Sequence, residues 1–143
     1  MARPEPGPVE VLIVCPVRDA QGTVAQTYVD VDRALRYAGV RARIVFVDRA
    51  SGDRTRELLE EYRRKDPRIR VLALPEVGGD AGVLEAAEAG SATAIVVVPA
   101  PGAATPAAFR AVLGALGRGA DVPRRRGGVW GYRRPPAPGV RVA

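Results

Sequence analysis

Apolar runs and amphipathic segments alternate along this chain. Runs of consecutive apolar residues are typical of strands buried on both faces, whereas apolar positions three and four apart are typical of helices. This pattern predicts strands at 9–14, 42–47, 69–74 and 94–98, and helices at 23–38, 53–65, 80–89 and 106–116. Such alternation predicts an α/β domain with a doubly wound, mostly parallel sheet that is covered on both faces.

Residues that favour helix ends stand at the ends of the predicted helices. Gly39 suits the C-terminus of the first helix, and the second ends before Pro67. Thr105 is a good N-cap residue, and Pro106 suits the first position of the last helix. These signals support the predicted boundaries independently of the apolar pattern.

The composition divides the chain into three regions. Residues 1–8 form a polar, proline-rich extension, residues 9–122 hold all the predicted elements, and residues 123–143 form a tail rich in Arg, Pro and Gly. Because the tail has few apolar positions, we expect it to be disordered. From residue 118 onward there are seven arginines and one acid, so the tail carries the excess of the net charge of +6. Contact of this tail with nucleic acid or lipid is conceivable, but a solvated tail is the simpler interpretation.

Histidine is absent from the chain, and Cys15 is its one cysteine. Triads built on histidine and intramolecular disulfides are therefore excluded. We expect Cys15 to be a buried core residue, because no histidine or lysine lies close in sequence to lower its pKa. The apolar stretch at 94–104 is short and interrupted by prolines, and the N-terminus does not look like a signal peptide. We therefore expect a cytoplasmic protein.

The carboxyl ends of the predicted strands should meet at one mouth, where parallel sheets bind ligands. Residues 16–20 read Pro-Val-Arg-Asp-Ala, residues 47–55 read Val-Asp-Arg-Ala-Ser-Gly-Asp-Arg-Thr, and residues 66–71 read Asp-Pro-Arg-Ile-Arg-Val. Their order resembles the nucleotide-sugar-binding half of family-2 glycosyltransferases of the GT-A fold, such as polyprenyl-phosphate sugar synthases. The corresponding family motifs are Pro-Val-Tyr-Asn-Glu, Val-Asp-Asp-Gly-Ser-x-Asp-Gly-Thr and Asp-Pro-Arg-x-Arg-Val. The resemblance covers about residues 9–122 and implies a truncated GT-A domain.

The resemblance also implies a site for a nucleotide or nucleotide sugar. Pro16 and Asp48 would line the pocket for the base and ribose, with Asp48 accepting a hydrogen bond from the base. Ser51 would shape the following turn, and Gly78 would allow close backbone approach. The complete predicted site consists of seven residues at the strand ends: Pro16, Arg18, Asp19, Asp48, Arg49, Ser51 and Gly78.

Simpler interpretations exist for several of these residues. An acid such as Asp48 favours a turn at a strand end even without a ligand. Arg18 and Arg49 could together hold a diphosphate, since guanidinium groups pair well with phosphate oxygens. However, they are two of 21 arginines, and we favour the interpretation that they are ordinary surface residues.

The largest departure from the family lies at the end of the fourth predicted strand. The family has Asp-x-Asp there, which holds a divalent cation against the sugar diphosphate, whereas this chain has Pro99-Ala100-Pro101. Divalent cations of this kind need oxygen ligands, which proline side chains do not offer. We therefore expect no metal and no other cofactor.

The chain also ends before the acceptor-binding half and the catalytic base of the family. We therefore expect a catalytically degenerate domain that binds a nucleotide or nucleotide sugar. One alternative is an active, metal-independent glycosyltransferase that another chain completes. A second alternative is a non-catalytic interaction module whose basic tail binds a partner. Pairing with a second copy or a partner subunit would fit a truncated sheet with an uncovered edge.

Overall fold

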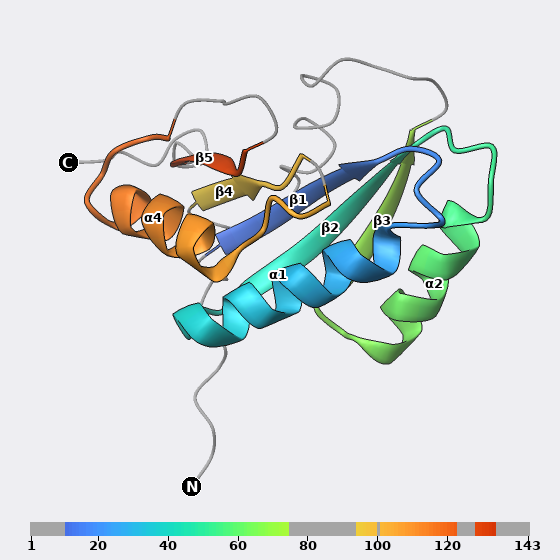
Figure 1. Cartoon of the computed structure of the whole chain (residues 1–143), viewed down its shortest axis with the longest axis horizontal. Coiled ribbons are helices and arrows are strands. Elements are labelled where there is room, and N and C mark those ends of the chain that lie inside the picture. The colour runs from blue at the N-terminus through green and yellow to red at the C-terminus, as the bar shows by residue number, and fades with distance from the viewer. Residues whose placement is uncertain (1–10, 75–93, 100, 123–127, 134–143) are drawn as a thin grey trace, which may run out of the picture.

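The structure is a computed structural model of the chain, and it describes residues 11–74, 94–99, 101–122 and 128–133 (Figure 1). The described elements follow one another as β1 (Val11–Val17), α1 (Val24–Ala38), β2 (Ala42–Arg49), α2 (Thr55–Lys65), β3 (Ile69–Leu74), β4 (Ala94–Val97), α4 (Pro106–Gly117) and β5 (Trp130–Arg133). The helix predicted at 80–89 and the extension at 1–8 lie outside the described residues. Every other predicted helix and strand is present within a few residues of its expected bounds.

The five described strands form one sheet in the order β3-β2-β1-β4-β5. β1 pairs in parallel with β2 and β4, and β2 pairs in parallel with β3. β5 is antiparallel to β4. The prediction of a mostly parallel α/β sheet is therefore confirmed, and the carboxyl ends of its four parallel strands face the same way.

Strand β5 lies beyond residue 122, where the sequence pattern places the end of the folded domain. Trp130 is opposite Val97 in the sheet, and the two aromatic rings of β5, Trp130 and Tyr132, are stacked 6.1 Å apart. A Cβ atom at Gly131 would lie 2.7 Å from the carbonyl oxygen of Ile95, so glycine is needed for this close approach. The expectation of disorder is thus wrong for residues 130–133. A short strand containing a glycine has no apolar run by which to recognise it.

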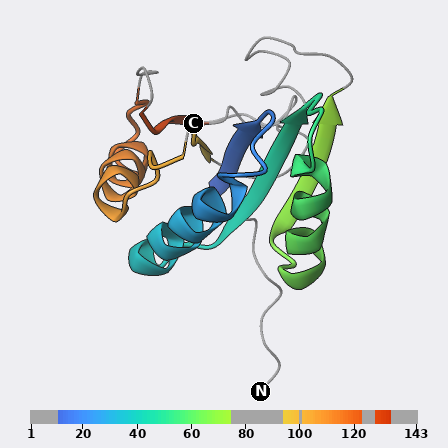
Figure 2. The same ribbon diagram turned by 45° about the vertical axis from the view of Figure 1, so that its right-hand side comes forward.

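The three described helices lie on one face of the sheet (Figures 1 and 2). Their apolar stripes pack on alternate strand residues, and Phe46 and Phe109 are among the largest side chains in this core. Alternate positions of the central strands point to the opposite face, where Val14, Val45 and Ile95 are also fully buried. Among the described helices, none combines the length and apolar character needed to cross a membrane.

The predicted helix-end signals operate as expected. Gly39 has a left-handed φ of 68°, and its N–H donates to the carbonyl oxygen of Leu35. The Thr105 hydroxyl accepts a hydrogen bond from the N–H of Ala108 at 3.1 Å, directly before Pro106 begins α4. These contacts satisfy backbone groups that a helix end would otherwise leave without partners.

A partly buried network ties α1 to the start of β3, at the edge of the sheet opposite the predicted site. The Asp66 carboxylate accepts hydrogen bonds from Tyr28 at 2.8 Å and from Arg68 at 2.6 Å. Arg68 also donates to Asp32 at 2.8 Å, and Tyr28 stacks on Tyr62. The hydrogen bonds from Arg68 lower the pKa of Asp66 to about 2, so its carboxylate is strongly stabilised in the folded protein.

Candidate functional site

The loop between β1 and α1 is bound directly to the loop between β2 and α2. Val17 and Asp48 are paired at the ends of the two strands, so the chain leaves both strands side by side. The N–H of Asp19 donates to Ser51 Oγ at 2.9 Å. In return, the N–H of Gly52 donates to Asp19 Oδ1 at 2.7 Å. Two residues of the predicted nucleotide site, Asp19 and Ser51, are therefore in contact.

Three further hydrogen bonds join the same loops. The N–H of Ala20 donates to the Thr55 hydroxyl at 2.7 Å, and the N–H of Gln21 donates to Asp53 Oδ2 at 3.2 Å. The N–H of Arg54 donates to Gln21 Oε1 at 3.0 Å. We call these five hydrogen bonds between residues 19–21 and 51–55 the loop latch. The Thr55 hydroxyl also donates to Asp53, which lowers the pKa of that acid.

Two residues in these loops adopt backbone conformations that favour glycine. Asp19 has a φ of 47° and Ala50 has a φ of 56°. The left-handed region costs an ordinary residue such as alanine about 1–2 kcal/mol. The hydrogen bonds of the loop latch offset this cost and fix the shape of both loops.

Asp48 and Arg49 end strand β2. The Asp48 side chain is buried, and its Oδ1 accepts a hydrogen bond from the N–H of Ser51 at 3.1 Å. This contact matches the simpler interpretation of Asp48 as an acid that forms a turn. A contact between Asp48 and a nucleobase remains a prediction, as does a role for Arg49 in binding.

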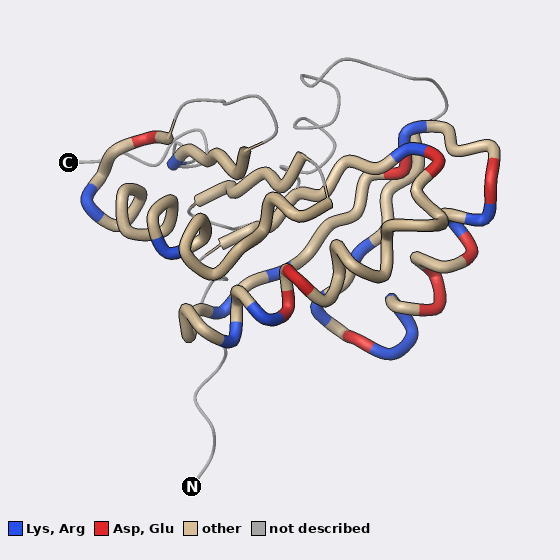
Figure 3. The backbone as a smooth tube through the Cα atoms, in the orientation of Figure 1, with Lys and Arg blue, Asp and Glu red and all other residues tan. Residues whose placement is uncertain are grey.

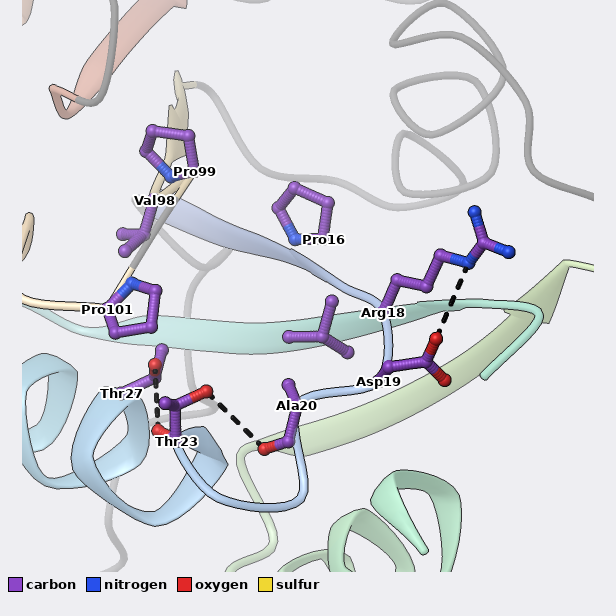
Figure 4. Close-up of a pocket in the computed structure, with 10 residues that line it drawn as sticks. Pro16, Arg18, Asp19, Ala20, Thr23, Thr27, Val98, Pro99 and Pro101 are labelled. Atoms are coloured by element: carbon purple, nitrogen blue, oxygen red, sulfur yellow. Dashed lines mark hydrogen bonds and ion pairs between the residues drawn. The ribbon is translucent and has the colours of Figure 1, made fainter. Parts of the chain in front are cut away.

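A pocket of about 180 Å³ lies at the ends of β1 and β4 and beside the start of α1 (Figure 4). It is lined by residues from the strand ends and the first turn of the helix: Pro16, Val17, Arg18, Asp19, Ala20, Thr23, Thr27, Val98, Pro99 and Pro101.

The pocket brings together only part of the predicted site. Pro16, Arg18 and Asp19 line it beside Pro99 and Pro101, which occupy the place of the acids expected from the resemblance. The remaining predicted residues do not: Asp48, Arg49 and Ser51 are absent from the lining, and Gly78 lies outside the described residues.

Two threonines at the start of α1, one of them its N-cap, also line the pocket, although the sequence pattern did not single them out. Thr27 is 5% exposed and falls on the apolar stripe of α1 between Val24 and Val31. A polar residue on the buried stripe of a helix, near the N-terminus that faces the strand ends, is a signal that could have identified Thr27. Thr23 lies one turn earlier, at the N-cap of α1.

The pocket lining combines apolar and polar residues in similar measure. Figure 4 shows Pro16, Val98, Pro99 and Pro101 around one side, with Arg18 and Asp19 at the opposite rim. Arg18 is the one cationic side chain among these lining residues. Asp19 is the one carboxylate among them, and its Oδ1 is already bonded to a backbone N–H.

The lining residues do not fit the divalent cation that the resemblance implies. Pro99 and Pro101 have no side-chain oxygen, and such cations are held mainly by carboxylates and other oxygen ligands. Across the part of the chain that the structure describes, no group of three His, Cys, Asp or Glu residues is arranged to hold a metal ion. The described residues at this end of the sheet therefore provide no set of ligands for a catalytic metal ion.

Cys15 is fully buried in strand β1, directly before Pro16. Burial raises the pKa of its thiol to about 12, because the charged thiolate would lose its hydration. The complete burial of Cys15 confirms the prediction that it is a core residue. A thiol with so high a pKa is also a poor nucleophile at neutral pH.

Comparison with known proteins gives one family and several similar folds. The sequence matches the family model "Glycosyl transferase family 2" over residues 13–135. The fold is similar to S. aureus TarS 1-349, with a TM-score of 0.57 and 16% identity, covering 76% of this chain and 32% of that chain. It is also similar to glucosyl-3-phosphoglycerate synthase from Mycobacterium tuberculosis in complex with Mn²⁺, UDP and glucosyl-3-phosphoglycerate. That comparison gives a TM-score of 0.52 and 19% identity, and it covers 76% of this chain and 39% of that chain.

A structure of S. aureus TarS 1-349 in complex with UDP gives a TM-score of 0.50 and 19% identity, covering 63% of this chain and 27% of that chain. No curated protein sequence matches. At these identities the structural likeness shows the fold alone. The chain spans about a third of the length of the structures it resembles.

Proposed function

The chain belongs to glycosyl transferase family 2, and from this premise we propose that its pocket between β1 and β4 binds a nucleotide or part of a nucleotide sugar. One observation carries the proposal. Pro16, Arg18 and Asp19, from the motif at the end of β1, line the same pocket as Pro99 and Pro101 at the end of β4. Parallel α/β sheets bind their ligands at such carboxyl ends.

The size of the pocket limits what it holds. Pockets that enclose drug-sized ligands measure about 300–1,000 Å³, whereas this one measures about 180 Å³. The residues that line it therefore suit one part of a nucleotide sugar, such as the ribose or a phosphate group. The loop between β1 and α1, which the loop latch ties to the neighbouring loop, forms one wall of the pocket.

We further propose that the domain does not transfer sugar by the metal-assisted route of its family. A bound cation in such enzymes offsets the negative charge that develops on the leaving diphosphate. Here Pro99 and Pro101 take the place of the acids, and the Asp19 carboxylate is engaged by the N–H of Gly52. These features support binding without metal-assisted transfer.

Titration calorimetry tests the binding proposal. UDP, GDP and their sugar derivatives are titrated into the protein with manganese and then with EDTA, and we expect binding that does not depend on manganese. Ala20→Leu, which places a larger side chain at the lining, should weaken binding at least about ten-fold through steric exclusion. Gln26→Leu, at an exposed position of α1, is the matched control and should leave the affinity unchanged.

Several outcomes would contradict the proposal. If none of these ligands binds, a non-catalytic interaction module becomes the better explanation. Equal binding by the Ala20→Leu variant would place the ligand elsewhere. Turnover of a nucleotide sugar in EDTA would support the alternative of a metal-independent transferase, whereas binding that requires manganese would contradict the assignment at Pro99 and Pro101.

A further inference from the structure

We propose that Arg18 binds a phosphate group of the ligand and supplies the positive charge that a divalent cation supplies in metal-dependent relatives. This inference rests on the proposed nucleotide function. Arg18 is the one cationic side chain among the described residues that line the pocket. It lies at the end of β1, across the pocket from Pro99 and Pro101 (Figure 4).

The structure separates Arg18 from Arg49, the second arginine that the sequence suggested for a diphosphate. Arg18 lines the pocket, whereas Arg49 ends strand β2 and does not. The two arginines therefore do not line this pocket together, and Arg18 alone supplies a guanidinium group at its rim. One guanidinium is sufficient for a bidentate contact, because its planar N–H groups match two phosphate oxygens.

The Arg18 side chain is able to turn toward a ligand. Its Nε lies 3.9 Å from Asp19 Oδ2, and both side chains are 53% exposed. An exposed ion pair at this distance contributes little to stability. Little is therefore lost when the guanidinium leaves Asp19 and faces the pocket.

The polar groups of the lining are arranged so that hydrogen-bond donors are available to an anion. The Asp19 carboxylate accepts the Gly52 N–H at 2.7 Å and is directed away from the prolines (Figure 4). Two neutral hydroxyls complete the polar lining. The hydroxyl of Thr23 donates to a carbonyl at 3.4 Å and that of Thr27 at 3.3 Å, both long for a hydrogen bond. These weak contacts leave both hydroxyls able to donate to a phosphate oxygen instead.

Calorimetry in EDTA with UDP and uridine separates the phosphate contact from the rest of the ligand. Arg18→Ala should weaken UDP binding at least about ten-fold, because a charge-assisted hydrogen bond is lost, and should leave uridine binding unchanged. Arg18→Lys should recover part of the UDP affinity, since it restores the charge without the fork of donors. Arg33→Ala, at an exposed position of α1, is the matched control and should bind UDP like the unchanged protein. GDP and guanosine serve as the second pair.

The outcomes distinguish this inference from the proposed function. If the unchanged protein binds none of the four probes, both are wrong. If it binds UDP or GDP and Arg18→Ala binds equally well, the role of Arg18 is wrong and nucleotide binding stands. Diphosphate binding that appears only with manganese would also overturn the role of Arg18. A preference of the unchanged protein for UDP over uridine that disappears in Arg18→Ala would support it.

Discussion

The two lateral halves of the sheet differ in charge. We call the half that contains β3, β2 and β1 the β1–β2 side, and the half that contains β4 and β5 the β4 side. α2, which packs against β2 and β3, has seven charged residues in its 11 positions, whereas α4, beside β5, has one, Arg110, in 12. Figure 3 shows charge concentrated around α1, α2 and their loops, with α4 and β4 largely uncharged. At the mouth, the β1–β2 side contributes Arg18 and Asp19, and the β4 side contributes Val98 and two prolines.

On the β1–β2 side, residues of the family motif have structural roles, so the presence of the motif does not by itself indicate a ligand. Ser51, Asp53 and Thr55, which carry much of the family resemblance, all take part in the loop latch. A structural role is sufficient to explain these three residues. The case for a ligand therefore depends on the pocket and on Arg18, whose ion pair with Asp19 is exposed and measures 3.9 Å.

Replacing both prolines of the β4 side by acids would remove the difference between the two sides at the mouth. Pro99→Asp with Pro101→Asp places two carboxylates on the pocket lining, and we expect this variant to gain manganese binding with a dissociation constant of about 1 mM or below. Calorimetry measures the gain, and Pro99→Ala with Pro101→Ala is the matched control that supplies no ligand. A folded double-Asp variant that binds no manganese would show that this strand end is not the metal position of the family.

The β5 edge of the sheet depends on one close backbone contact. Gly131→Ala would place a Cβ 2.7 Å from the Ile95 carbonyl oxygen and 3.2 Å from Leu116 Cδ1. We expect the free energy of unfolding to fall by about 1–3 kcal/mol, the usual cost of overpacking. Urea denaturation measures the change. Gly117→Ala, with open space around the added Cβ, is the control, and an equal effect of both variants would mean that β5 does not pack as described.

The same two sides show what the sequence could predict. The apolar runs of β1 and β2 and the end signals Gly39 and Thr105 placed the core elements within a few residues. The family resemblance and the α/β fold are likewise confirmed. β5 was missed because its pairing depends on the missing side chain of Gly131, which no periodic pattern reveals.

The site was predicted less completely than the fold. Pro16 and Pro99 lie close together because β1 and β4 are neighbouring parallel strands. That the carboxyl ends of the parallel strands lie together follows from the expected topology. Which side chains face the pocket, and which are engaged by the neighbouring loop, depends on contacts between residues more than 30 positions apart, such as Asp19 with Ser51. A single sequence contains no local signal for such pairs.

The loop latch of the β1–β2 side is tested by Thr55→Val, which keeps the shape of the side chain and removes its hydroxyl. Thr55 is fully buried, and the N–H of Ala20 would lose its acceptor. We expect a loss of about 1–2 kcal/mol in the free energy of unfolding by urea. Ser51→Ala, in the more exposed part of the latch, should cost less. If Thr55→Val is neutral, the latch does not contribute to stability.

The network at the opposite edge is tested through the pH dependence of stability, because its contribution is present at neutral pH and is lost in acid. The folded protein holds the pKa of Asp66 at about 2, below the ordinary value of 3.8. Because the folded pKa is the lower one, Asp66 stabilises the fold fully above about pH 4, and this contribution is lost as the pH falls toward 2. Urea midpoints measured between pH 5 and pH 2.5 should therefore decline, and Asp66→Asn should flatten part of that decline. Glu61→Gln, on the exposed side of α2, should leave the slope unchanged, and an equal slope for Asp66→Asn would mean that the acid sensitivity arises at acids other than Asp66.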